Sequence, residues 1–100
     1  MSEETREQAL ARIAQREDIL GRVRQILIDA LHVQRPPEQI DPDVSLFGTG
    51  LCLDSVDAVE LLVCLETEFG LVADPASGRA IMRTVNTVID AVVAHAEVPS

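Results

Sequence analysis

The sequence has no lysine, tryptophan or tyrosine, and only 2% of its residues are aromatic. Without lysine, the chain cannot form a Schiff base with a carbonyl substrate. With two phenylalanines as its only aromatic residues, it offers few rings on which bases could stack. Eight arginines stand against 17 acidic residues, giving a net charge of −9. This charge disfavours nucleic acids and anionic membrane surfaces as partners.

Basic residues are also missing from one long part of the chain. Residues 36–78 contain nine carboxylates and no Arg or His, whereas six of the eight arginines precede them. One interpretation is an ordinary solvated acidic face. The other is a docking surface for proteins with basic patches. Ser55 lies in the middle of this acidic stretch, which favours the second interpretation.

Signals for metal binding and for membranes are absent as well. Cys52 and Cys64 lack zinc-finger spacing, and no neighbouring His or Cys completes a site, so no metal is expected. We expect Cys64 to be a small buried residue on a helix and Cys52 to lie in a partly exposed loop. No apolar run is long enough to span a bilayer, and the first residues lack the apolar core of a signal peptide. The expectation is a cytoplasmic protein without stable membrane insertion.

One hundred residues, 47% of them apolar, are enough for one small domain with a modest core. Apolar residues at helical spacing predict a first helix that begins near Asp18 and ends at or just before Arg35, where Pro36 and Pro37 follow. Residues 1–16 form an N-terminal extension, helical or frayed, in which Thr5 to Gln8 fit a capping box. The domain proper is expected at 17–97, with a tail at 98–100.

The rest of the chain predicts a long loop and three more helical segments. The loop, 36–54, is irregular yet rich in apolar residues, so we expect it to be pinned onto the core. A helix is predicted over 55–69, ending at Gly70, then a turn or short helix reaching Met82, and a last helix from the N-cap Thr84 to about Ala96. The residues expected to be buried on the helix over 55–69 are Val56, Val59, Leu62, Val63 and Leu65.

Ser55 is the most informative residue of the chain. It stands at the start of the predicted helix over 55–69, where backbone N–H groups point outward and negative charge is favoured. No His, Lys or Arg lies near it in the sequence to activate the hydroxyl. A serine that is presented but not activated indicates a substrate for another enzyme. A plain helix-capping serine is the simpler alternative.

The run around Ser55 resembles the modification site of acyl carrier proteins, which have Asp-Ser-Leu at the start of their second helix. Here Asp54-Ser55-Val56 takes that place, and the resemblance continues through Asp57–Val63 and Leu65–Gly70. It extends more weakly over about residues 17–96. The resemblance implies a small all-α four-helix bundle of acyl-carrier type, with a long loop between the first and second helices and a short third helix.

The resemblance also implies a function. Ser55 would receive 4′-phosphopantetheine from coenzyme A through a phosphopantetheinyl transferase, and acyl groups would travel on that arm as thioesters in fatty acid or polyketide-type biosynthesis. The chain would be a monomeric carrier and not an enzyme, and its extension is a candidate for self-association. Acyl-loading and condensing enzymes with basic docking surfaces would be its further partners. The residues expected to meet these partners are Asp54, Val56, Asp57, Glu60, Glu66 and Glu68.

Two other functions remain open at this point. One is an acidic helical adaptor that binds basic partners without a prosthetic group. The other is a small hydrolase using Ser55, which would need His32 or His95 folded back onto it, although no Gly-x-Ser-x-Gly elbow is present. Leu51-Cys52-Leu53 departs from the smaller residues common before the serine in this family, which favours a specialised carrier. The acyl cargo is not readable from the sequence.

Overall fold

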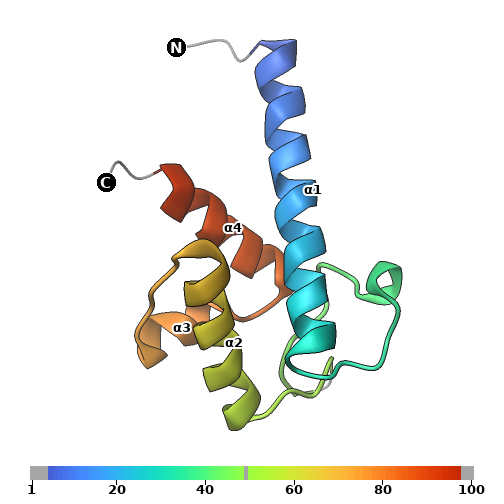
Figure 1. Ribbon diagram of the computed structural model, residues 1–100, viewed down its shortest axis with the longest axis vertical. Coiled ribbons are helices and arrows are strands. Elements are labelled where there is room, and N and C mark those ends of the chain that lie inside the picture. Colours follow the sequence, from blue (N-terminus) through green and yellow to red (C-terminus); the bar gives the residue numbers. More distant parts are fainter. Residues whose placement is uncertain (1–4, 49, 98–100) are drawn as a thin grey trace.

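Four α-helices and one short 3-10 turn account for the regular structure in the computed structural model, which describes residues 5–48 and 50–97 (Figure 1). The helices are α1 (Arg6–Asp29), α2 (Ser55–Phe69), α3 (Pro75–Ile81) and α4 (Val85–Glu97), and the turn is η1 (Pro37–Gln39). No β-strand occurs within these residues. The predicted all-α bundle, with its long loop and short third helix, is confirmed.

α1 is a single continuous helix of 24 residues that begins well before Asp18. The capping box predicted at its start is present: Gln8 N–H donates to Thr5 Oγ1 (3.1 Å) and Thr5 N–H donates to Gln8 Oε1 (2.9 Å). The predicted start of this helix near Asp18 is therefore wrong, because Asp18 lies inside α1.

The end of α1 also differs from the prediction. The helix stops at Asp29 and not near Arg35, because His32 turns the backbone into the left-handed region with φ 59°. Histidine adopts this conformation more readily than most residues other than glycine. Carbonyl groups in the last turn of α1 accept hydrogen bonds from the residues that follow the helix: Leu31 N–H donates to Ile26 O (3.3 Å), and Val33 N–H donates to Leu27 O (2.9 Å).

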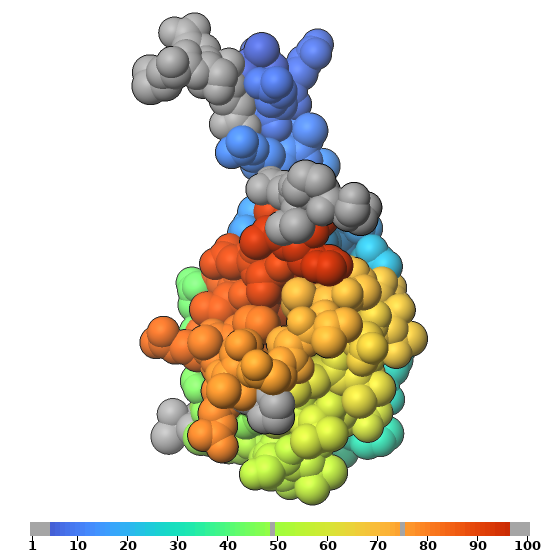
Figure 2. All heavy atoms as spheres, turned by 90° about the vertical axis from the view of Figure 1, so that its left-hand side faces the viewer, coloured from blue at the N-terminus to red at the C-terminus, as the bar shows by residue number. Residues whose placement is uncertain are grey.

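The two halves of α1 have different environments. Its C-terminal half buries Ile19, Val23 and Leu27 in the bundle core, whereas Leu10 and Ile13 near its start are each 55% exposed. The first turns of α1, drawn in blue, project beyond the body of the molecule (Figures 1 and 2). This overhang gives the molecule its long dimension, with extents of 42 × 29 × 21 Å.

The long loop is fixed to the bundle as expected. Its apolar residues Ile40, Leu46 and Leu53 are buried in the core. Both guanidinium nitrogens of Arg24 that face the loop donate to Ile40 O (3.1 and 2.8 Å). Leu46 N–H donates to Arg83 O (3.0 Å), which ties the loop to the residues just before α4. The loop therefore forms one wall of the fold, although it lacks long regular structure.

The bounds predicted for α2 are confirmed, but its predicted buried side is only partly right: Leu65 is buried and Leu62 is half-buried, whereas the three valines are exposed. Its fully buried residues are Leu61 and Leu65. Val56, Val59 and Val63 are 76%, 63% and 51% exposed, respectively. The cause is composition, because apolar residues surround most of this helix and the packing against the rest of the bundle selects the side that is covered.

The last two helices follow the predicted pattern. α3 begins after Asp74, whose Oδ1 accepts from Ser77 N–H (2.7 Å), and reaches Met82 as its C-cap. α3 approaches α2 closely at Gly78, where an added Cβ would lie 3.1 Å from a Leu62 methyl. The apolar side of α4 is predicted to consist of Val85, Val88, Ile89, Val92 and Val93, and the first four are buried while Val93 is half-buried.

Candidate functional site around Ser55

Ser55 is the first residue of α2 and is exposed. The helix start is fixed by a reciprocal pair: Asp57 N–H donates to Asp54 Oδ1 (2.9 Å) and Asp54 N–H donates to Asp57 Oδ2 (3.0 Å). Asp54 is thus the N-cap, so the capping role is not performed by Ser55. Among the described residues the Ser55 hydroxyl has no hydrogen-bond partner, and it is available for a reaction.

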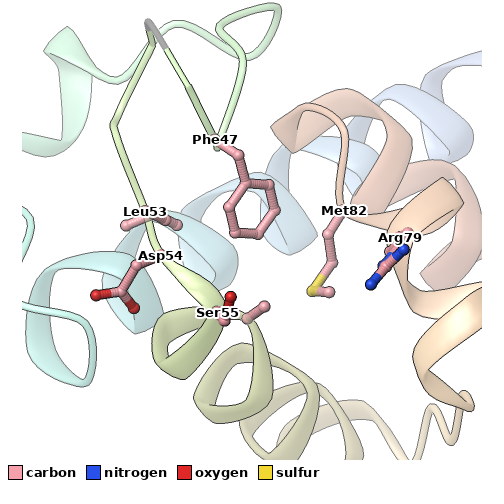
Figure 3. A pocket seen from close by; sticks show the side chains of 7 residues that line it. Phe47, Leu53, Asp54, Ser55, Arg79 and Met82 are labelled. Carbon is pink, nitrogen blue, oxygen red and sulfur yellow. The ribbon is translucent and has the colours of Figure 1, made fainter.

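A cavity of about 460 Å³ opens beside this hydroxyl. Its walls come from the long loop, from the start of α2 and from α3 with its C-cap (Figure 3). They are formed by Phe47, Leu53, Asp54, Ser55, Ala58, Arg79 and Met82. Most of these side chains are apolar, so the cavity suits an apolar or amphipathic chain that starts at Ser55.

Tight local geometry shapes the loop that leads to Ser55. Leu51 N–H donates to Ser45 O (2.9 Å), and Leu53 N–H donates to Leu46 O (3.0 Å). Gly50 lies so close to this turn that a Cβ at its position would collide with Ser45 O. These contacts bring Phe47 and Leu53 together next to the start of α2, where both line the cavity.

Arg79 is the residue of this site that the sequence did not reveal. It lies on α3, 24 positions after Ser55, and reaches the same cavity only because α3 packs beside α2. One signal was available: Arg79 is the first basic residue after the acidic stretch at 36–78. Arg83 follows it four residues later, so this signal alone did not single out Arg79.

The six residues predicted to meet partners lie on or next to α2, but they are not equally free. Val56, Glu60 and Glu66 are exposed. Glu68 is bound within the chain, since its Oε1 accepts from Arg22 Nε (2.9 Å) and Nη2 (2.6 Å). The carboxylates of Asp54 and Asp57 bind backbone N–H groups, as described above, and Asp57 is half-buried.

The two cysteines on either side of this helix start differ in exposure. Cys52 is exposed in the loop, with φ 59°, and Cys64 is half-buried on α2. Partial burial, followed by the negative charge of Glu60, raises the pKa of the Cys64 thiol. In the part of the chain that the structure describes, no group of three or more His, Cys, Asp or Glu side chains is arranged to hold a metal ion.

The histidines give no support to a Ser55 hydrolase. The ring of His95 lies near Gly70, at the opposite end of α2 from Ser55. His32 is exposed beyond the end of α1, and neither histidine is a hydrogen-bond partner of Ser55. Among the described residues, the Ser55 hydroxyl therefore has no histidine to activate it, unlike the serine of a Ser-His-Asp hydrolase. None of the described helices combines the length and apolarity needed to cross a bilayer.

Comparison with known proteins identifies the family. Residues 21–92 match the family model described as a phosphopantetheine attachment site. An acyl carrier protein of Thermosynechococcus vestitus is 41% identical over 73% of this chain and 85% of its own length. Acyl carrier proteins of Rubrobacter xylanophilus and Cyanidioschyzon merolae are 36% and 35% identical, over 80% and 79% of this chain and 94% and 82% of their own lengths.

The match to the family model covers all residues that line the Ser55 cavity; it begins within α1 and ends within α4. The matches confirm the resemblance noted in the sequence and the covalent phosphopantetheine predicted from it. The exposed hydroxyl and the neighbouring cavity fit such a group, because an arm joined at Ser55 has an apolar wall beside it. The chain belongs to the acyl carrier protein family, and it is a carrier that other enzymes load and unload, not an enzyme itself.

Proposed function

We propose that Ser55 carries the 4′-phosphopantetheine arm and that the chain holds acyl groups on it as thioesters for fatty acid or polyketide-type biosynthesis. The observation that supports this assignment is the free Ser55 hydroxyl at the start of α2, beside a cavity of about 460 Å³. The dipole of α2 favours the negative charge that modification adds at this position.

The modification needs a transferase that supplies the general base for the Ser55 hydroxyl. Ser55 Oγ attacks the phosphorus on the pantetheine side of the coenzyme A pyrophosphate. The new O–P bond forms as the pyrophosphate P–O bond breaks, and adenosine bisphosphate leaves. The hydroxyl proton passes to a base of the transferase, because no described histidine lies near Ser55 and the neighbouring carboxylates of Asp54 and Asp57 accept the backbone N–H groups of the helix start. The product is a phosphodiester whose far end bears the thiol that forms the thioester.

Partner enzymes would dock on the outer side of α2. Val56, Val59 and Val63 are spaced three and four residues apart, so they form one exposed row that starts next to Ser55. Glu60 and Glu66 are exposed on the same helix and have no partner among the described residues. An apolar row with acidic neighbours suits a partner surface that combines an apolar groove with arginines or lysines.

The chain's N-terminal extension, residues 1–16, is proposed to be separate from the domain at 17–97, with a tail at 98–100. The exposed Leu10 and Ile13 lie on the part of α1 that projects from the bundle. We propose that the bundle itself is a monomer and that this overhang meets a partner or a second copy. Its removal is treated in the Discussion.

Mass spectrometry tests the Ser55 assignment. The wild-type chain is incubated with coenzyme A and a promiscuous pantetheinyl transferase, and its intact mass is expected to rise by one phosphopantetheine. Ser55→Ala should gain nothing. Ser77→Ala is the matched control, because Ser77 is also exposed in the first turn of a helix and should leave the gain unchanged. Modification of Ser55→Ala would overturn the assignment, and no modification of wild type would favour the adaptor without a prosthetic group.

A further inference from the structure

Arg79 is the only basic side chain among the residues that line the Ser55 cavity. It has no hydrogen bond or ion pair with any described residue. Arg16, Arg22 and Arg24, by contrast, each bind an oxygen of the chain. The Arg83 side chain is also unpaired among the described residues, but it does not line the Ser55 cavity, so Arg79 is the unpaired cation at this site.

The carboxylates near Arg79 are already engaged. Asp54 accepts from the α2 backbone, and its carboxylate points away from the cavity (Figure 3). Asp43 lines the adjoining cavity together with Arg79, but its Oδ1 accepts from Asn86 Nδ2 (2.6 Å). Neither carboxylate forms an ion pair with Arg79, so the guanidinium donors are not used by any described residue.

An anion fixed at Ser55 would meet the charge of this guanidinium. We propose that the Arg79 guanidinium pairs with the phosphodiester formed on Ser55 and holds the base of the arm against α3. This inference rests on the assignment of Ser55 as the attachment site. Guanidinium groups suit phosphate oxygens because their N–H donors form a planar fork that can bind two oxygens at once.

The proposed pair has a structural consequence for α3. This helix has only seven residues, and such a short segment depends on its contacts with the bundle. An ion pair between Arg79 and an anion on the first residue of α2 adds a link between the two helices. The end of α3 should therefore be more stable against unfolding in the modified protein than in the unmodified one.

A thermodynamic cycle measures this link. Unfolding by urea is followed for wild type and Arg79→Gln, each in the unmodified form and in the modified form without cargo. Modification is expected to lower the ratio of unfolded to folded protein about two- to fivefold more in wild type than in Arg79→Gln, because the pair is partly exposed. Arg79→Lys should keep part of this difference, since it keeps the charge but not the fork.

Arg83→Gln is the matched control. Arg83 lines the adjoining cavity but not the one that contains Ser55, and its side chain also has no hydrogen bond or ion pair with a described residue. Its substitution should leave the effect of modification on unfolding unchanged. In parallel, the phosphorus NMR signal of the modified protein should shift in Arg79→Gln and stay in place in Arg83→Gln.

The two proposals fail in different ways. If Ser55 is not the attachment site, Ser55→Ala still gains the mass of the arm. If Ser55 is modified but Arg79 does not bind the phosphodiester, modification alters the unfolding of wild type and Arg79→Gln equally and the phosphorus signal does not move. An effect of Arg79→Gln that appears only once an acyl cargo is attached would also overturn the pairing, because the cargo and not the phosphodiester would then be its partner.

Discussion

α2 and α4 use the same residue type for opposite purposes. Each carries several valines over a similar length, 15 and 13 residues. On α4, Val85, Val88 and Val92 are buried in the core, whereas on α2 the row of Val56, Val59 and Val63 faces outward. The core of α2 is made instead by Leu61 and Leu65. The valines of α4 thus contribute to the core, whereas those of α2 lie at the surface in a row that starts next to Ser55.

This contrast shows why an apolar pattern alone does not locate a docking surface. An apolar row on a helix is normally core, because burial of apolar area is the main driving force of folding. α2 carries two apolar rows, and only one of them can face the bundle. The uncovered row is a candidate for contact with other proteins, since it begins next to Ser55, the proposed attachment residue.

The largest expected effect is a difference in the free energy of unfolding between a valine substitution on α4 and one on α2. Val88→Ala on α4 removes two methyl groups from a fully buried site and should lower the free energy of unfolding by about 2–3 kcal/mol. Val59→Ala on α2 should change it by less than about 0.5 kcal/mol, because this side chain is mostly in solvent. Urea unfolding of both variants checks the comparison, and equal losses would contradict the exposed placement of the α2 row.

The sequence predicted the parts of the fold that local signals define. Asp54 and Gly70 bracket α2, the latter with φ 70°, and both ends of this helix were predicted. The end of α1 was not, because no glycine or proline marks the turn at His32. The buried side of α2 was partly misassigned for the reason given above, which lies in tertiary packing.

The candidate site likewise contains residues that the sequence indicated and residues that only the structure revealed. Ser55 and its acidic flank were visible because they are contiguous and resemble a family pattern. Arg79 was not, because it reaches the cavity through the packing of α3 on α2. The engagement of Glu68 by Arg22 was hidden too, since these residues are 46 positions apart. Sequence signals thus pointed to the proposed attachment residue, while its surroundings required the structure.

The second prediction concerns recognition by the outer side of α2. Glu60→Lys should slow modification by a pantetheinyl transferase roughly three- to tenfold at low salt, and the defect should shrink as salt rises. Glu38→Lys, on the exposed turn η1, should have little effect. Asp57 is unsuitable for this test, because it is half-buried and its carboxylate holds the start of the helix. Equal rates for Glu60→Lys and wild type at low salt would remove α2 from the docking surface.

A smaller effect is expected from the overhang of α1, whose exposed Leu10 and Ile13 resemble the α2 row. Truncation before Glu17 removes the ion pair between Arg16 and Asp90 (2.8 Å), which is exposed and contributes less than about 1 kcal/mol. Thermal unfolding and the rate of Ser55 modification should therefore change little, while partner choice or self-association changes. Arg16→Gln isolates the ion pair. A collapse of the thermal transition on truncation would place the overhang within the core domain.

The smallest effect concerns how the helices begin, where α3 and α4 again differ. Asp74 caps α3 with a carboxylate, whereas Thr84 caps α4 through its hydroxyl, which accepts from Thr87 N–H (3.2 Å). The hydrogen bond from Ser77 N–H lowers the pKa of Asp74 below its ordinary value of 3.8. A carboxylate with a lowered pKa stabilises the folded state fully above the unfolded value, and this contribution is lost as pH falls through the lower folded value.

Acidification should therefore loosen the start of α3 before that of α4. NMR can follow the Ser77 and Thr87 amide signals between about pH 5 and pH 2, the range in which such a carboxylate titrates. The Ser77 signal should move with the protonation of Asp74, and the Thr87 signal should not follow that step. Asp74→Asn keeps an oxygen that can cap the helix but has no charge to lose, so it should abolish the Ser77 step while α3 persists. A Ser77 step that survives in Asp74→Asn would show that another carboxylate controls the start of α3.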